Sequence, residues 1–162
     1  VYQSKNDPSA LVSRLLADSS NDKLSFSKQE FSQDGDKQML TGPLLRPNKL
    51  IFRVDEDNQP YYVYFSEESV QMIAKKMLKN GLLDKLNLEH DSDQPVEGDL
   101  IETWFVEDPE SDKQNVYGLN YEKGTWMGTY HISSKHIWDE YVKTGKVKGF
   151  SIQGFFQDRQ IQ

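Results

Sequence analysis

The sequence contains no cysteine, and this absence excludes several kinds of chemistry. Without a thiol, the protein can have no cysteine nucleophile, no thiolate metal ligand and no disulfide. The lack of cysteine also fits a reducing, cytoplasmic compartment. Long apolar runs are missing too: no segment approaches the roughly 18 residues of a membrane-spanning helix, and no signal-peptide pattern opens the chain.

Positive charge and histidine are also scarce. There are 19 lysines and arginines against 26 acidic residues, which gives a net charge of −7, and only three histidines. Nucleic-acid binding is therefore not expected, because it needs clustered basic side chains. The chain opens on Val1 instead of an initiator methionine, which indicates trimming or processing.

The 162 residues are enough for one domain with a sizeable core. Residues 1–37 form a polar segment with one short amphipathic helix pattern, in which Asp7 is a plausible N-cap and Pro8 fills the first helical position. From residue 38 the chain becomes richer in aromatic and β-branched residues. The sequence therefore predicts an N-terminal segment, 1–37, and a folded domain, 38–162.

The domain reads as an α+β fold. Its helices are expected over 66–81, with Ser66 as N-cap and Gly81 at the end, and over 133–145, capped by Ser133 or Ser134 and closed by Gly145. The first helix should bury Val70, Ile73, Ala74, Met77 and Leu78. Strands are expected within 39–65 and over 86–91, 100–108, 125–132 and 146–156, with a loop over 109–124. Because strands outnumber helices and do not alternate with them, the pattern favours a mostly antiparallel sheet or small barrel flanked by helices.

The last predicted strand places a small hydroxyl, Ser151, between two glycines. Alternation puts Phe150, Ile152 and Phe156 on one face, which reads as core. Val147, Gly149, Ser151, Gln153 and Phe155 lie on the other face, which glycine leaves open. Two interpretations stand: a nucleophilic serine beside a slot for a peptide, or a bulged strand whose serine bonds locally.

A nucleophilic serine needs a base within hydrogen-bond reach. His136 lies on a charged stretch of a predicted helix, and His131 ends a strand. His90 differs, because in 86–91 it shares a face with Leu86 and Leu88. It is either a general base or a satisfied core histidine.

Acidic residues offer two further interpretations. A hairpin centred near Pro95 or Val96 would place Glu102 or Ile101 opposite His90, so Glu102 could orient the imidazole or remain a surface acid. Asp91, Asp93 and Glu102 also fit positions 1, 3 and 12 of a calcium loop. Pro95 and Val96 break that template, so no metal or other cofactor is predicted.

Several long segments together resemble the phage prohead serine proteases, and more narrowly the phage-type branch related to the herpesvirus assemblins. They include "GPLLRPNKLIFRVDEDNQPYYVYFS", "NLEHD", "IETWFVEDPESDK", "GTWMGTYHI" and "IWDEYVKTGKVKGFSIQGFF", in order, over roughly 38–157. The resemblance implies a small antiparallel β-barrel wrapped by helices. It implies Ser151, in the GFS-type motif, as nucleophile and His90, in the NxxH-type motif, as general base. Gly149, Ile152 and Gly154 would then form the oxyanion and substrate slot.

The same resemblance implies a function. A maturation protease would work inside the assembling prohead, in the bacterial host cytoplasm, on the major capsid protein and the scaffold protein. The portal and a second copy of the chain are further candidate partners; nucleic acid and membrane are not expected as partners. The third catalytic member is left open between Glu102, Asp158, a residue beyond Gln162 and a bare dyad. The alternative function is an inactive protease-fold module bound to capsid or portal.

Overall fold

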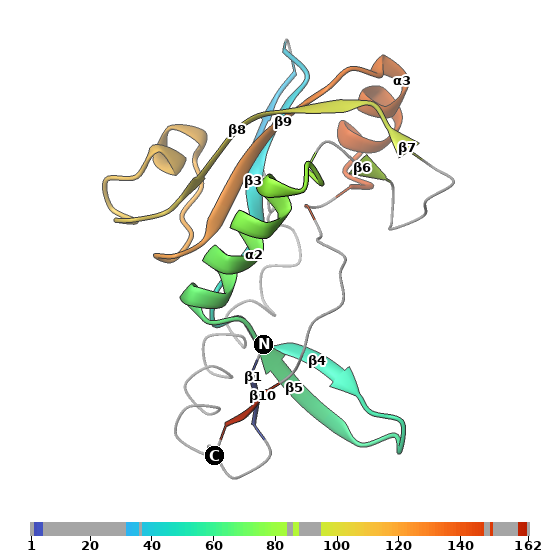
Figure 1. The fold of residues 1–162 in the computed structure, drawn as a ribbon. Coiled ribbons are helices and arrows are strands. Elements are labelled where there is room, and N and C mark those ends of the chain that lie inside the picture. Colours follow the sequence, from blue (N-terminus) through green and yellow to red (C-terminus); the bar gives the residue numbers. More distant parts are fainter. Residues whose placement is uncertain are drawn as a thin grey trace.

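The structure is a computed structural model that describes residues 2–4, 32–35, 37–83, 86–87, 95–147, 150 and 159–161 (Figure 1). Its main sheet has four antiparallel strands in the order β2-β3-β9-β8. They are β2 (Ser32–Asp34), β3 (Met39–Leu45), β9 (Trp126–Ile132) and β8 (Gly98–Phe105). Strand β9 lies inside the sheet, which explains why six of its seven residues are buried.

A second four-stranded sheet has the order β10-β1-β5-β4. It is built from β1 (Tyr2–Ser4), β4 (Ile51–Val54), β5 (Pro60–Tyr64) and β10 (Arg159–Ile161). Strands β1 and β10 run parallel, and the other pairs are antiparallel. The α+β class with mostly antiparallel sheets is confirmed, but the described strands close no barrel: both sheets are open.

Strands from both sides of residue 38 pair with one another. Strand β2 pairs with β3, and β1 pairs with β5 and β10. The predicted amphipathic helix near Asp7 lies outside the described residues. The division into 1–37 and 38–162 stays a prediction.

Helix α2 (Glu67–Lys79) begins and ends where local sequence signals predict. The Ser66 hydroxyl accepts a hydrogen bond from the Ser69 backbone N–H, as an N-cap should. Gly81 has a left-handed φ of 60° two residues after the last helical one. Val70 and Ala74 are buried as expected, but Leu78 is 49% exposed, so its place in the buried stripe was wrong.

The second predicted helix is confirmed as a short α3 (Lys135–Ile137) that continues into a π-helical turn, η2 (Trp138–Val142). Ser134, one of the two predicted caps, accepts from the Ile137 N–H. Gly145 follows with a φ of 71°. In the expected loop 109–124 the structure instead has a 3₁₀ helix, η1 (Lys113–Tyr117).

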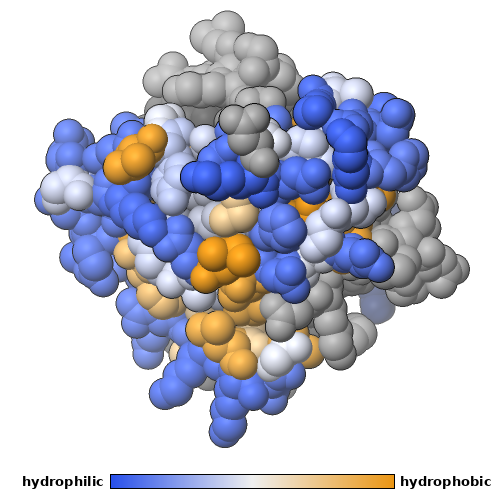
Figure 2. Space-filling view, turned by 90° about the horizontal axis from the view of Figure 1, so that it is seen from above, coloured by the Kyte–Doolittle hydropathy of each residue, from blue (hydrophilic) through white to orange (hydrophobic). Residues whose placement is uncertain are grey.

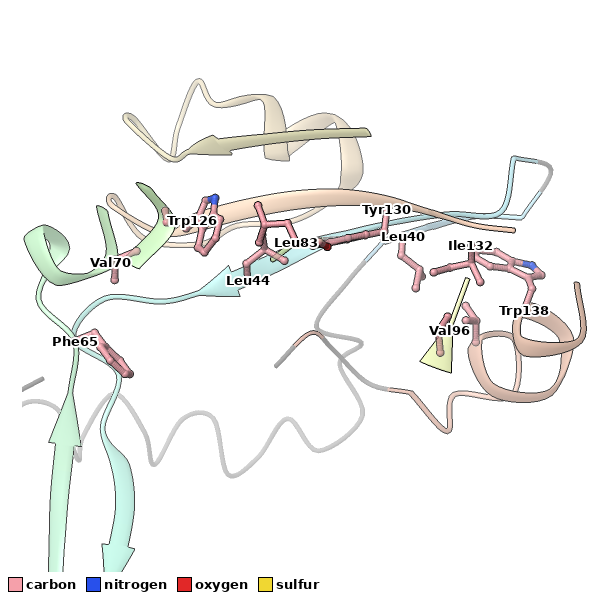
Figure 3. Close-up of a cluster of buried hydrophobic side chains, with 12 residues drawn as sticks. Leu40, Leu44, Phe65, Val70, Leu83, Val96, Trp126, Tyr130, Ile132 and Trp138 are labelled. Carbon is pink, nitrogen blue, oxygen red and sulfur yellow. Dashed lines mark hydrogen bonds between the residues drawn. The ribbon is translucent and has the colours of Figure 1, made fainter. Parts of the chain in front are cut away.

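The core lies on one face of the main sheet (Figure 3). Trp126, Tyr130 and Ile132 project from β9 into it and meet residues of α2 and η2, such as Val70 and Trp138. A smaller cluster covers the opposite face under η1, where Val106 and Met127 are both fully buried and Leu119 is nearly so. The two faces of β9 therefore serve two different clusters.

A β-bulge in β8 interrupts the alternation of its side chains. Leu100 pairs with Tyr130, yet Glu102 pairs with Thr129, so Ile101 is the extra residue. Leu100 packs against the main core, while Trp104 packs against the smaller cluster. Because a bulge shifts every later side chain to the other face, Glu102 lies on the η1 side instead of the core side.

The hairpin expected to place His90 opposite Ile101 or Glu102 was wrong. Strand β6 (Leu86–Asn87) pairs with β7 (Pro95–Val96), and Asn87 lies opposite Pro95. Strand β8 pairs with β9 instead. The sequence pattern could not reveal this register, because the pairing of a strand depends on partners that are distant in the chain.

The surface carries apolar side chains at scattered positions. Among the described residues, the face shown in Figure 2 is mostly hydrophilic, with hydrophobic residues gathered near its centre and a separate one towards the upper left. Single exposed apolar residues, such as Met72 on α2 and Val116 on η1, are normal for a globular protein. No helix within the described ranges is long and apolar enough to cross a membrane.

Candidate active site

Most of the predicted site lies outside the described residues. These positions are Ser151, His90, Gly149, Ile152, Gly154 and Asp158. The Ser151–His90 distance therefore stays a prediction. The structure does describe residues close in sequence to Ser151 and to His90, together with Glu102.

Phe150, immediately before Ser151, is anchored in the main core. Its ring lies 5.1 Å, centroid to centroid, from the ring of Tyr130, at an interplanar angle of 49°. This confirms the expectation that Phe150 lies on the core side. Val147 packs against the same cluster, although alternation had placed it on the serine face. Its N–H donates to the Tyr141 carbonyl at 3.1 Å, and residues 146–147 are not in a strand, so the alternation expected there does not apply.

The segment that carries His90 is anchored on either side. Before it, the carbonyl of the buried Leu83 accepts a hydrogen bond of 2.9 Å from the Tyr130 hydroxyl. After it, Val96 of β7 is buried in the main core. The β6–β7 pairing brings the two ends of the intervening segment together.

Tyr130 thus contacts residues next to both predicted catalytic segments: its ring packs on Phe150, before Ser151, and its hydroxyl bonds to Leu83, before His90. It is 2% exposed and lies in the same cluster as Leu83 and Val96 (Figure 3). Sequence reasoning treated it only as part of strand 125–132. A tyrosine on the core face of a buried strand could have indicated this role, because a buried phenol usually needs a hydrogen-bond partner for its hydroxyl.

Glu102 has contacts of its own. Its Oε2 pairs with the Lys113 ammonium group, and its Oε1 accepts hydrogen bonds from Thr129 at 3.2 Å and Tyr117 at 3.3 Å. Burial raises the pKa of Glu102, but the hydrogen bonds and the charge of Lys113 outweigh it, so the pKa lies below its ordinary value. The hydrogen bond to Glu102 raises the pKa of Lys113.

These contacts tie η1 to the main sheet. Lys113 also lies over the Trp104 ring at 5.3 Å, and the Trp104 indole donates to Asp112 at 3.1 Å. All of this is on the face opposite Tyr130. Glu102 as the third catalytic member stays a prediction, and that role would require His90 to reach the η1 face.

The described residues contain another serine–histidine–aspartate group, near the end of β9. Nδ1 of His131 lies 3.5 Å from the Ser133 hydroxyl and 3.8 Å from an Asp99 carboxylate oxygen. In a catalytic triad the two oxygens face opposite ring nitrogens, whereas here both face Nδ1. This group therefore lacks the geometry of a triad. His136 is exposed on α3, as predicted.

Among the described residues there is no cluster of three or more histidine and acidic side chains that could hold a metal ion. Asp91 and Asp93 of the calcium-loop template lie outside the described residues. Glu102, the third residue of that template, is paired with the Lys113 ammonium, which would compete with a cation.

Comparison with known families identifies the chain. Residues 28–159 match the family described as Putative phage serine protease XkdF. The match covers more than half of the chain and spans His90, Glu102 and Ser151. No curated protein and no solved structure shows a significant match. The chain belongs to the family described as Putative phage serine protease XkdF.

Proposed function

We propose that the protein is a serine endopeptidase that cleaves scaffold and capsid proteins during prohead maturation, with Ser151 as nucleophile and His90 as general base. The family match over both residues carries the proposal. The contacts of a single buried side chain, Tyr130, with Phe150 and Leu83 support it, because the segments that carry Ser151 and His90 then both begin at the same core cluster.

The chemistry follows from the two side chains. Ser151 Oγ attacks the carbonyl carbon of the scissile peptide, while a ring nitrogen of His90 takes the hydroxyl proton. The tetrahedral intermediate collapses, the C–N bond breaks, and the leaving amine takes that proton from His90. Water then attacks the Ser151 ester with His90 again as base, which releases the acid and restores the serine.

The oxyanion would be stabilised by backbone N–H groups around Gly149 and Ile152, and Gly154 would leave room for the substrate chain. No cofactor takes part in these steps. The third member is proposed as Glu102, as Asp158, or as a residue beyond Gln162; a bare dyad is the remaining option.

The proposed substrates are the major capsid protein and the scaffold protein, and the proposed place of action is the prohead interior during assembly in the host cytoplasm. The net charge of −7 supports this setting, because an acidic protein is not held by the packaged genome. The portal and a second copy of the chain remain candidate partners.

The first prediction tests the dyad. The wild-type chain, co-expressed with its capsid and scaffold proteins, should generate cleaved products, and a fluorophosphonate should label Ser151. Ser151→Ala should abolish both, and His90→Ala should reduce labelling by at least about a hundredfold, because general-base catalysis contributes that much. Intact-mass and peptide mass spectrometry measure both effects.

His131→Ala and His136→Ala are the matched controls and should label at the wild-type rate. Cleavage by Ser151→Ala at the wild-type rate would contradict the assignment. If the folded wild-type chain binds capsid or portal but is neither labelled nor cleaves, the protein is the inactive structural module instead.

A further inference from the structure

The contacts of Tyr130 exceed what its core position requires. A phenylalanine would fill the same space on β9, yet the tyrosine hydroxyl reaches the backbone carbonyl of Leu83, 47 residues earlier in the chain. The same ring packs on Phe150. We propose that Tyr130 is a positioning residue that holds the His90 and Ser151 segments in register with one another. This inference rests on the proposed function.

The hydroxyl contact fixes the start of the His90 segment. Leu83 is 7% exposed, so its carbonyl has little access to water if the phenol is removed. A buried acceptor without a donor is costly. The carbonyl would therefore move toward another donor, and the chain leading to β6 would move with it.

The ring contact fixes the approach to Ser151. Phe150 directly precedes the serine, so its ring contact with Tyr130 restrains the chain where the serine segment begins. Upstream, the Val147 N–H donates to Tyr141. The serine segment is thus anchored to η2 on one side and to Tyr130 at Phe150.

Rigidity of this kind matters for a serine and a histidine that belong to different parts of the chain. A misplacement of about 1 Å can reduce the rate about a hundredfold. Tyr130 itself is buried and touches no substrate, so it would act through the position of the two segments.

The test compares Tyr130→Phe with Ser69→Ala. Each change removes one buried hydroxyl that takes part in a hydrogen bond, since the Ser69 hydroxyl accepts from Ser66 at 3.0 Å. Ser69 lies in the first turn of α2, and its hydroxyl and its N–H both form hydrogen bonds with the Ser66 hydroxyl. Phe150→Leu is a second variant, which removes the ring contact while keeping an apolar side chain.

Hydrogen exchange measured by mass spectrometry reads the positioning directly, whether or not the protein is active. Tyr130→Phe should raise exchange about tenfold in peptides covering 84–95, because one hydrogen bond to a buried carbonyl is lost. Phe150→Leu should raise exchange in peptides covering 148–153. Ser69→Ala should change neither. Unchanged exchange over 84–95 in folded Tyr130→Phe would overturn the inference.

Activity supplies the second readout. Tyr130→Phe should lower kcat and the rate of fluorophosphonate labelling about tenfold, with KM for the capsid substrate changed less than about twofold, because the loss falls on the chemical step. An equal loss in Ser69→Ala at matched melting temperature would show a merely structural effect. A wild-type chain that is neither labelled nor active contradicts the proposed function, whereas labelled wild type with equally active Tyr130→Phe contradicts only the positioning role.

Discussion

At the scale of single residues, the bulge at Ile101 determines what Glu102 can contact. Strict alternation along β8 would put Glu102 on the core face beside Leu100, where its charge would be buried among apolar side chains. The bulge turns it to the other face, where Lys113, Tyr117 and Thr129 surround it. A carboxylate that accepts several hydrogen bonds keeps its charge, which explains the lowered pKa of Glu102.

The Glu102–Lys113 ion pair makes the stability of the folded protein depend on pH. The folded pKa of Glu102 is lowered, so its contribution to stability is present above the unfolded value of 4.5 and is lost as pH falls through the folded pKa. The folded pKa of Lys113 is raised, so its contribution is present below 10.5 and is lost as pH rises through the folded pKa. The pair therefore stabilises the protein at neutral pH.

Lys113→Met should lower the free energy of unfolding at pH 7 by less than about 1 kcal/mol, because both side chains are partly exposed. Methionine has a side chain of similar length without the charge, so the change removes both the ion pair with Glu102 and the cation–π contact with Trp104. Urea unfolding at pH 7 and at pH 3 measures the difference, which should shrink at pH 3 and in high salt. A loss that is equal at both pH values would contradict the ion-pair explanation.

Glu102→Gln separates the two roles of this residue. If Glu102 only anchors η1, the substitution should reduce the free energy of unfolding slightly and leave the labelling rate of Ser151 unchanged. If Glu102 is the third catalytic member, the substitution should reduce the labelling rate by several orders of magnitude, because an amide holds the wrong tautomer of the histidine.

At the scale of elements, the signals that could be read from the sequence were local ones. Ser66, Ser134, Gly81 and Gly145 mark helix ends through contacts within a few residues, and each was placed correctly. Helix η1 was missed because its stabilising contacts are not periodic. It depends on Gln114, which is fully buried and exchanges two hydrogen bonds with the backbone of Tyr121.

Strand pairing was predicted less well because it depends on distant partners. The polar run before Gly98 was expected to form the turn between strands 86–91 and 100–108, but it holds β7, which pairs with β6. Strand β8 is then free to pair with β9, and the Thr103 hydroxyl, for example, donates to the carbonyl of Met127, 24 residues later. The sequence of β8 alone does not specify that partner, and the bulge follows from it.

Strand β9 also packs closely against Leu44 at Gly128, a contact that could not be predicted from the sequence of the strand. An added Cβ at Gly128 would lie 2.8 Å from Leu44 Cδ1, and Leu44 is itself buried at 6% exposure. Gly128→Ala should therefore reduce the free energy of unfolding by about 1–3 kcal/mol through overpacking, measured by urea unfolding.

Two variants check that explanation. Gly35→Ala, where an added Cβ meets nothing within 4 Å, should change stability by only a few tenths of a kcal/mol. Leu44→Val combined with Gly128→Ala should cost less than the sum of the two single changes, because the smaller side chain makes room for the new methyl group. Additive costs would argue against the steric cause.

At the scale of the whole molecule, the two ends of the chain meet in one sheet. Strand β1 lies between β5 and β10, so residues 2–4 pair with residues 159–161, and residues 2–3 also pair with β5 (Figure 1). The main sheet likewise uses β2 from the N-terminal segment. Composition suggested a boundary near residue 38, because polar residues dominate before it. Strands pair through backbone hydrogen bonds, so a segment with a polar composition can still pair with the strands of the domain.

The last prediction concerns this pairing. Deleting residues 1–37 removes β1 and β2 and leaves the edges of β5, β10 and β3 without their partners. A loss of about 2 kcal/mol would lower Tm by roughly 4–8 °C in a chain of this size. Exposed strand edges should also make the shortened chain associate. Calorimetry and analytical ultracentrifugation measure the two effects.

A deletion of residues 1–31 separates the contributions of the two strands, because it keeps β2 and its pairing with β3 while removing β1. If both strands matter, Tm should fall in steps, with the 1–31 deletion between the full chain and the 1–37 deletion. An unchanged Tm and full Ser151 labelling in the 38–162 chain would instead establish 38–162 as an independent domain. The strands of the N-terminal segment would then be accessory to it, although they complete both sheets.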